Sequence, residues 1–203
     1  VNADLIAAGL SPFQPEQVAF DAGRLMLKRI EQLTAADKSF TFETTLATRC
    51  YLRKIPQWRL AGYTVRLCFL KLPNPEFSIR RVAQRVALDG HAIPEETIRR
   101  RYTRGWENLK NHYTGLVDAW AIYDATQTPP RLIETGENPE KTKLMDSPPT
   151  PARPVASPFF IRVEAALARA SAKAIAKARA AGLEPVVADS PSEKDLKRRG
   201  GKP

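Results

Sequence analysis

The chain has 203 residues, which is enough for one sizeable domain and an appendage. Hydrophobic residues make up 43% of the sequence, and this share excludes wholesale disorder. No apolar run approaches the roughly 20 residues that a membrane-spanning helix needs, and no secretory signal is visible, so we expect a cytoplasmic protein with no membrane partner. The net charge of +10 suits anionic ligands, whether nucleotides, nucleic acid or acidic proteins, and does not choose among them.

The first half of the chain predicts two helices separated by a strand. Residues 15–33 carry apolar side chains at helical spacing, and Pro15 suits a first helical position. Residues 40–46 are rich in aromatic and β-branched side chains and predict a strand, although Glu43 breaks the apolar pattern. A second helix is expected from about Thr48, interrupted by Pro56 and ended near Gly62.

The second half predicts the main strands. Residues 63–72 are nearly continuously apolar, as in a strand covered on both faces, and Cys68 within them is expected to be a small core residue. One helix is expected after Asn74 and another from Pro94, followed by strands at 120–123 and 131–134. The alternation of strands and helices predicts an α/β fold with a parallel sheet and helices on both faces. Ligands of such folds bind at the carboxyl ends of the strands.

The composition changes after residue 137. Residues 138–158 are rich in proline, serine and threonine and predict a semi-stiff linker. Residues 159–182 predict a basic, alanine-rich helical appendage, and residues 183–203 a disordered tail. The basic helix could dock on the core, bind an acidic partner or contact nucleic acid, and its shortage of aromatic residues disfavours nucleic acid. Cys50, Cys68 and two histidines lie at scattered spacings that predict neither a disulfide scaffold nor a metal site.

Two carboxylates are candidates for chemistry. Asp4 follows a short apolar start and precedes a helical stretch, so it could stand at the mouth of a sheet and accept a proton from a hydroxyl. The alternative is that Asn2 or Asp4 only caps that helix. Glu43, followed by Thr44 and Thr45, could hold a magnesium-bound water or a sugar hydroxyl, or could be an ordinary surface strand residue.

Basic residues gather on the two helices around the turn at His91. Arginine forks match phosphate oxygens, so the cluster suits an anion site, although many charge runs are only solvated helix faces. The residues concerned are Arg80, Arg81, Arg85, His91, Arg99, Arg100, Arg101 and Arg104.

Together these features resemble the zeta-toxin family of P-loop kinases, in its broad bacterial branch. The resemblance covers about residues 1–135, and it is specific as a set because the order and spacing of its motifs match. The first matching stretches are Val1–Ala7, Leu10–Pro12 and Phe42–Leu46. The later ones are Ala61–Tyr63, Ile79–Val82, Gly90–Glu96 and Ile98–Arg101.

The resemblance implies a three-layer P-loop fold that uses ATP with Mg²⁺ to phosphorylate a hydroxyl of a small metabolite. The best-known members phosphorylate UDP-N-acetylglucosamine and are restrained by a small antitoxin protein. By position, the resemblance makes Asp4 the catalytic base, and Glu43, with Thr44 and Thr45, the substrate contacts. It makes Arg81 a phosphate contact and places His91 near a second such position, which is arginine in well-studied members. Arg85, Arg99 and Arg100 would then be lid contacts to the phosphates of ATP.

One expected motif has no counterpart in the sequence. The family carries a strand and the loop G-x-x-x-x-G-K-[ST] before the Asn-Ala-Asp motif, and the 203 residues contain no such loop. We therefore expect either a fragment of a longer protein or a truncated remnant that acts as a binding module. A basic nucleic-acid-binding protein is the further alternative.

Overall fold

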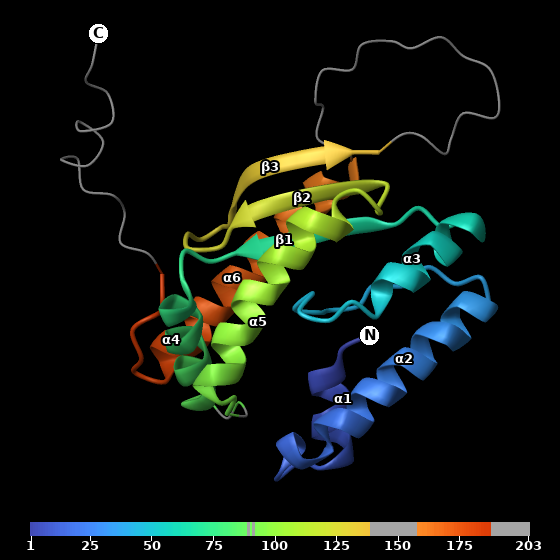
Figure 1. Cartoon of the computed structure of the whole chain (residues 1–203). Coiled ribbons are helices and arrows are strands. Elements are labelled where there is room, and N and C mark those ends of the chain that lie inside the picture. The colour runs from blue at the N-terminus through green and yellow to red at the C-terminus, as the bar shows by residue number, and fades with distance from the viewer. Residues whose placement is uncertain (89, 91, 139–157, 188–203) are drawn as a thin grey trace, which may run out of the picture.

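The computed structural model describes residues 1–88, 90, 92–138 and 158–187 (Figure 1). The predicted linker, most of the predicted tail and His91 lie outside the described residues, and the domain boundaries stay a prediction. The elements in chain order are α1 (Ala3–Leu10), the 3₁₀ turn η1 (Pro15–Val18), α2 (Ala19–Ala35), α3 (Tyr51–Leu60), β1 (Arg66–Lys71), α4 (Pro75–Val86), α5 (Glu95–Asn108), the π-helical turn η2 (Leu109–Tyr113), β2 (Ala119–Asp124), β3 (Arg131–Glu137) and α6 (Pro158–Ala180).

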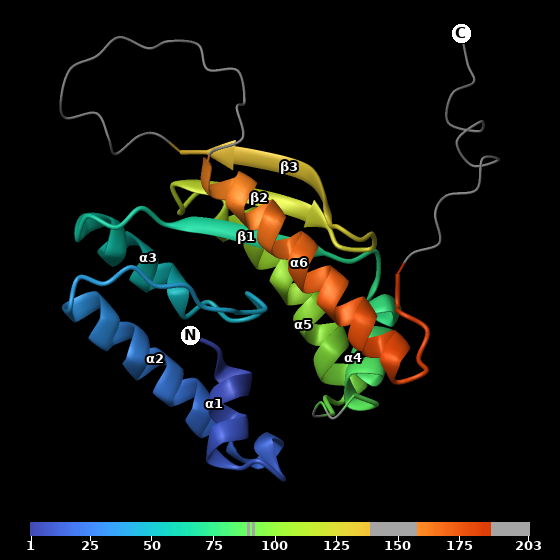
Figure 2. The ribbon, with the colours of Figure 1, turned by 180° about the vertical axis from the view of Figure 1, so that it is seen from behind.

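The described strands form one mixed sheet in the order β1-β2-β3. β1 and β2 are parallel, with Arg66 opposite Ala119 and Lys71 opposite Asp124. β3 pairs with β2 in the antiparallel sense, because the short connection between them returns the chain along the same edge. Figure 2 shows α6 across one side of the sheet and α5 on the other. The predicted α/β class with helices on both faces is therefore confirmed, and the sheet is mixed, since β3 runs antiparallel to β2.

Side-chain caps define where two of the helices begin. The Asn2 side chain accepts hydrogen bonds from the backbone N–H groups of Asp4 and Leu5, at 2.8 and 3.2 Å, so Asn2 is the cap of α1. Asn74 caps α4 through a 2.8 Å bond from the Phe77 N–H, as the sequence predicts. These caps fix the helix starts that carry Asp4 and the α4 arginines.

The core has two parts, one on each face of the sheet. The larger part joins α2 and α3 to η2 and β2, with Ile30, Leu109 and Tyr113 fully buried. The smaller part lies under α6, where Phe160 packs against Ala121 and Tyr123 of β2. The basic C-terminal helix therefore docks on the core, which was one of its predicted roles. Within the described ranges, no helix has the length and apolar character needed to cross a membrane.

Three local expectations are wrong. Residues 40–46 form no strand in the described sheet, because the backbone-to-backbone hydrogen bonds given for this segment go to Val1: Thr41 O accepts from the Val1 amino group, and Glu43 N donates to Val1 O at 3.3 Å. Helix α3 continues through Pro56, since the burial of its apolar face compensates for the lost hydrogen bond. Cys68 is exposed rather than buried, because no strand of the described part of the chain lies beside that edge of β1.

Candidate functional site

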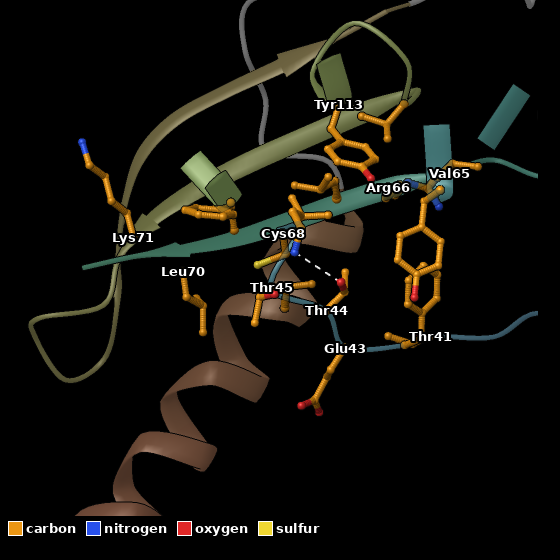
Figure 3. A pocket seen from close by; sticks show the side chains of 18 of the residues that line it. Thr41, Glu43, Thr44, Thr45, Val65, Arg66, Cys68, Leu70, Lys71 and Tyr113 are labelled. Carbon is orange, nitrogen blue, oxygen red and sulfur yellow. Dashed lines mark hydrogen bonds between the residues drawn. The ribbon is translucent and has the colours of Figure 1, made fainter. Parts of the chain in front are cut away.

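A cavity of about 1660 Å³ lies between residues 39–46 and β1 (Figure 3). Residues of α3, η2, α4, α5 and α6 complete the lining, and most of the side chains that line the cavity are apolar. Charged lining residues include Glu43, Lys71, Arg85 and Arg101. Three of the sequence-predicted site residues, Glu43, Thr44 and Thr45, come from the extended segment itself and follow one another along the wall.

Asn2 connects the two candidate carboxylates. Its side-chain oxygen caps the helix that carries Asp4, while its Nδ2 donates a 3.0 Å hydrogen bond to Oε2 of Glu43. The start of α1 and the extended segment are therefore fixed to each other at this point. The side chains of Asp4 and Glu43 both stay exposed, so both can reach a ligand.

Arg85 of α4 brings positive charge to the same place. Its Nη1 lies 3.9 Å from Oδ2 of Asp4, and its side chain also lines the cavity. Both partners are about half exposed, with 46% and 61% of their side-chain surface accessible, so solvent screens this pair strongly. Glu43 and Arg85 therefore line the cavity, whereas Asp4 contacts Arg85 without itself lining the cavity.

Arg81 lies one turn before Arg85 on α4, and its side chain contacts two backbone oxygens instead of Asp4. Its guanidinium donates to the backbone oxygen of Ala125, directly after the carboxyl end of β2, and to Val186 O at 3.4 Å. Burial lowers the pKa of Arg81, and the negative charge of Asp124 partly opposes this effect. The segment after α6 is held on α4 by the amide of Gln84, which donates to Glu184 O and accepts from Val186 N at 3.2 Å.

The remaining predicted arginines do not line the cavity. Arg99 forms ion pairs with Glu76 and, at 3.9 Å, with Glu95 on the exposed side of α4 and α5. The Glu76 carboxylate raises the pKa of Arg99. Arg100 is exposed on α5 outside the cavity lining, and its neighbour Arg101 lines the cavity instead.

Gly105 sets how closely α5 approaches the Thr44–Thr45 wall. A Cβ at Gly105 would lie 2.4 Å from the backbone oxygen of Thr45. We expect Gly105→Ala to lower the free energy of unfolding by about 1–3 kcal/mol, because the clash outweighs the gain of roughly 1 kcal/mol in helix propensity. Urea unfolding monitored by circular dichroism measures this change.

Gly23 in the interior of α2 is the matched control for that substitution. Apart from the backbone of its own helix, a Cβ added at Gly23 would meet no atom within 4 Å. Gly23→Ala should therefore raise the free energy of unfolding by about 0.5–1 kcal/mol. A Gly105→Ala protein as stable as the unmodified chain would contradict the close approach of α5 to Thr45.

Two residues of the site receive no role of their own from the sequence: Asn2, and Arg101, which belongs to the predicted basic cluster without being singled out in it. Asn2 was expected at most to cap a helix, and its second bond, to Glu43, joins residues 41 positions apart that no local pattern relates. Arg101 belongs to a run of three arginines, and successive residues on a helix point about 100° apart. The run alone therefore does not show which of the three arginines faces the cavity. The buried Ile98 helps, because Arg101 lies three residues after it and therefore on the same face of α5.

We next consider the groups that would bind a metal ion and the phosphates of a nucleotide. Among the described residues, no group of three or more histidine, cysteine, aspartate or glutamate side chains could hold a metal ion. The sequence also lacks the phosphate-cradling loop G-x-x-x-x-G-K-[ST].

Comparison with known proteins gives the chain a family. An uncharacterized protein of Haemophilus influenzae is 26% identical over 102 residues, which is 50% of this chain and 73% of that protein. No solved structure matches the chain significantly. The family model described as zeta toxin matches residues 11–147. Since this range is well over half of the sequence, the chain belongs to the zeta-toxin family, whose members have a kinase-like P-loop fold.

Proposed function

We propose that this chain contributes the acceptor side of a phosphotransferase site, at which a hydroxyl of a small metabolite receives a phosphoryl group from ATP. A nucleotide sugar such as UDP-N-acetylglucosamine is the proposed acceptor. Two observations carry the proposal: Arg85, which lines the cavity together with Glu43, lies 3.9 Å from Asp4, and Asn2 links the start of the Asp4 helix to Glu43. Membership of the zeta-toxin family supports the reaction class.

Each residue has a role that follows from its chemistry. Asp4 accepts the proton of the attacking hydroxyl, so that the oxygen becomes a better nucleophile. Glu43, held by the Asn2 amide, accepts a hydrogen bond from a second hydroxyl of the acceptor, and Thr44 and Thr45 line the same wall. Arg85 balances the negative charge that gathers around the reacting oxygens. ATP with Mg²⁺ supplies the phosphoryl group when it is bound.

The other proposed phosphate contacts rest on the family resemblance. Arg81 stands at the carboxyl end of β2, where its present partners are backbone oxygens that a phosphate could replace. Arg99 and Arg100 stay proposals without a contact to the cavity. A small antitoxin as partner is likewise proposed from the toxin–antitoxin context of the family.

The direct test is transfer itself. We expect the purified chain, incubated with Mg²⁺-ATP and UDP-N-acetylglucosamine, to form a phosphorylated sugar that phosphorus NMR and mass spectrometry detect. A parallel incubation without the sugar controls for plain ATP hydrolysis. ATP consumption at the same rate in both would contradict a hydroxyl acceptor of this kind.

A second candidate function is a binding module that does not transfer phosphate. It is favoured by one observation, the absence of the phosphate-cradling loop from the 203 residues. Titration calorimetry of the same chain with Mg²⁺-ATP separates the two functions. Micromolar affinity would support the phosphotransferase, whereas no binding of ATP together with no transfer would support the binding module.

A further inference from the structure

The wall that carries Thr44 and Thr45 ends in a turn with an unusual backbone. Leu46 has a φ of 56°, which lies in the left-handed region that residues other than glycine rarely adopt. Its side chain is buried, with 5% of its surface exposed. Such a conformation is strained by itself and persists only where the surrounding structure holds it. The contacts of this turn therefore decide the shape of the wall.

Both threonine hydroxyls of the wall are oriented by backbone groups of the turn. The N–H of Leu46 donates to Oγ1 of Thr44 at 3.2 Å, a bond drawn dashed in Figure 3. The N–H of Ala47 donates to Oγ1 of Thr45 at 3.5 Å. A hydroxyl oxygen that accepts a hydrogen bond can still donate its own hydrogen to a ligand. The two peptide units that flank Leu46 thus set the direction of these hydroxyls.

Asn108 of α5 holds one of these two peptide units. Its Nδ2 donates a 2.8 Å hydrogen bond to the backbone oxygen of Leu46, and its Oδ1 accepts from Nε of Arg49 at 3.2 Å. The oxygen of Leu46 and the N–H of Ala47 belong to the same planar peptide unit, so the bond to the oxygen also fixes the N–H. Asn108 is only 5% exposed, where an amide without partners would be costly.

The end of α5 is shaped so that the helix contacts this loop more than once. Directly after Asn108 comes the π-helical turn η2, in which the Thr114 N–H donates to Leu109 O at 3.1 Å. The buried Tyr113 donates from its hydroxyl to Thr48 O at 2.8 Å. In an uninterrupted α-helix, residues 108 and 113 would point about 140° apart. The π-helical turn therefore allows Asn108 and Tyr113 to contact the same loop.

We propose that Asn108 is a positioning residue of the acceptor site. It does not line the cavity, and it acts through Leu46 on the hydroxyl of Thr45. That hydroxyl donates a hydrogen bond to an oxygen of the bound metabolite. An amide suits position 108 because Leu46 O needs a donor and Arg49 Nε needs an acceptor. This role rests on the acceptor site proposed above.

Asn108→Asp removes the donor to Leu46 O and keeps an acceptor for Arg49. The affinity for UDP-N-acetylglucosamine, measured by titration calorimetry, should fall about fivefold, the loss expected of one hydrogen bond. Asn138→Asp is the matched control, because the Asn138 amide also donates to two backbone oxygens and does not line the cavity. We expect this control to bind as the unmodified chain does.

Thr45→Val separates positioning from a general loss of stability. Removal of the hydroxyl alone should weaken binding about fivefold. Since Asn108 acts through this hydroxyl, the double variant Asn108→Asp with Thr45→Val should also lose about fivefold, whereas independent effects would multiply to about twenty-five-fold. If Asn108→Asp does not fold, as circular dichroism would show, Asn108→Ser repeats the test, because water can fill the polar space that serine leaves.

Three outcomes would overturn this role of Asn108. The first is unchanged affinity in the folded Asn108 variant. The second is a double variant whose losses multiply, which would mean that Asn108 does not act through Thr45. The third is an equal loss in Asn138→Asp, which would show a general effect of stability on binding. No binding by the unmodified chain is a separate result, because it would contradict the acceptor site itself and, with it, the role of Asn108.

Discussion

Replacing Asp118 by leucine is expected to lower the free energy of unfolding by about 3–5 kcal/mol. The Oδ1 of Asp118 lies 2.8 Å from Nη2 of Arg59, and its Oδ2 accepts a 2.7 Å hydrogen bond from the Val65 N–H. Arg59 is only 10% exposed, and in the described part of the chain its other bond is the one that Nη1 donates to Leu116 O. The substitution would leave a buried guanidinium without its anion.

The control for this prediction removes both charges. In the double variant Arg59→Met with Asp118→Leu, no buried charge is left without a partner, so we expect a smaller loss of stability than in Asp118→Leu alone. Urea unfolding of the two single variants and the double variant gives the coupling free energy. A loss below about 1 kcal/mol for Asp118→Leu, or strictly additive losses, would show that the pair does not hold α3 to the start of β2.

Replacing Asp4 by asparagine should reduce kcat by about 10²–10⁴-fold, because asparagine cannot accept the hydroxyl proton. KM for the acceptor should stay within about threefold, since the residues proposed to position the acceptor are unchanged. Asp4 also stands in the first turn of α1, where a negative charge stabilises the helix by roughly 0.3–1 kcal/mol. The assay is initial-rate transfer to UDP-N-acetylglucosamine.

Asp21→Asn separates catalysis from helix electrostatics. Asp21 is the acidic residue in the first turn of α2, so its replacement removes the same kind of charge from a comparable helix position. We expect this variant to keep the kcat of the unmodified chain. Turnover by Asp4→Asn at the rate of Asp21→Asn would rule out Asp4 as the base.

The sequence predicts the elements that local signals define. The continuous apolar run at residues 63–72 corresponds to β1, and the Asn74 cap with Pro75 gives the start of α4 correctly. The side chains of the extended segment at 40–46 have high β propensity, which predicts a strand. Propensity alone cannot supply the neighbouring backbone that a strand needs, so that prediction is wrong.

Part of the candidate site could likewise be predicted from the sequence, and part could not. The positions of Asp4 and Glu43 after apolar stretches single them out in the sequence. In the fold, Glu43 and Arg85 line one cavity, and Arg85 lies 3.9 Å from Asp4. The contact of Asn2 with Glu43 and the pairing of Arg59 with Asp118 join distant parts of the chain. Such contacts follow from packing of the whole domain, so no periodicity or cap signal could reveal them. The prediction of a buried Cys68 fails for the same reason, since its exposure depends on the edge position of β1.

The most direct test of the acceptor site is the affinity of this chain for UDP-N-acetylglucosamine, measured by titration calorimetry. We predict measurable binding that weakens about tenfold in Glu43→Gln, the loss expected of one hydrogen bond to a charged group. Glu31→Gln is the control, because Glu31 pairs with Lys54 and does not line the cavity. No binding by the unmodified chain, or equal binding by the Glu43→Gln and Glu31→Gln variants, would contradict the proposed acceptor site.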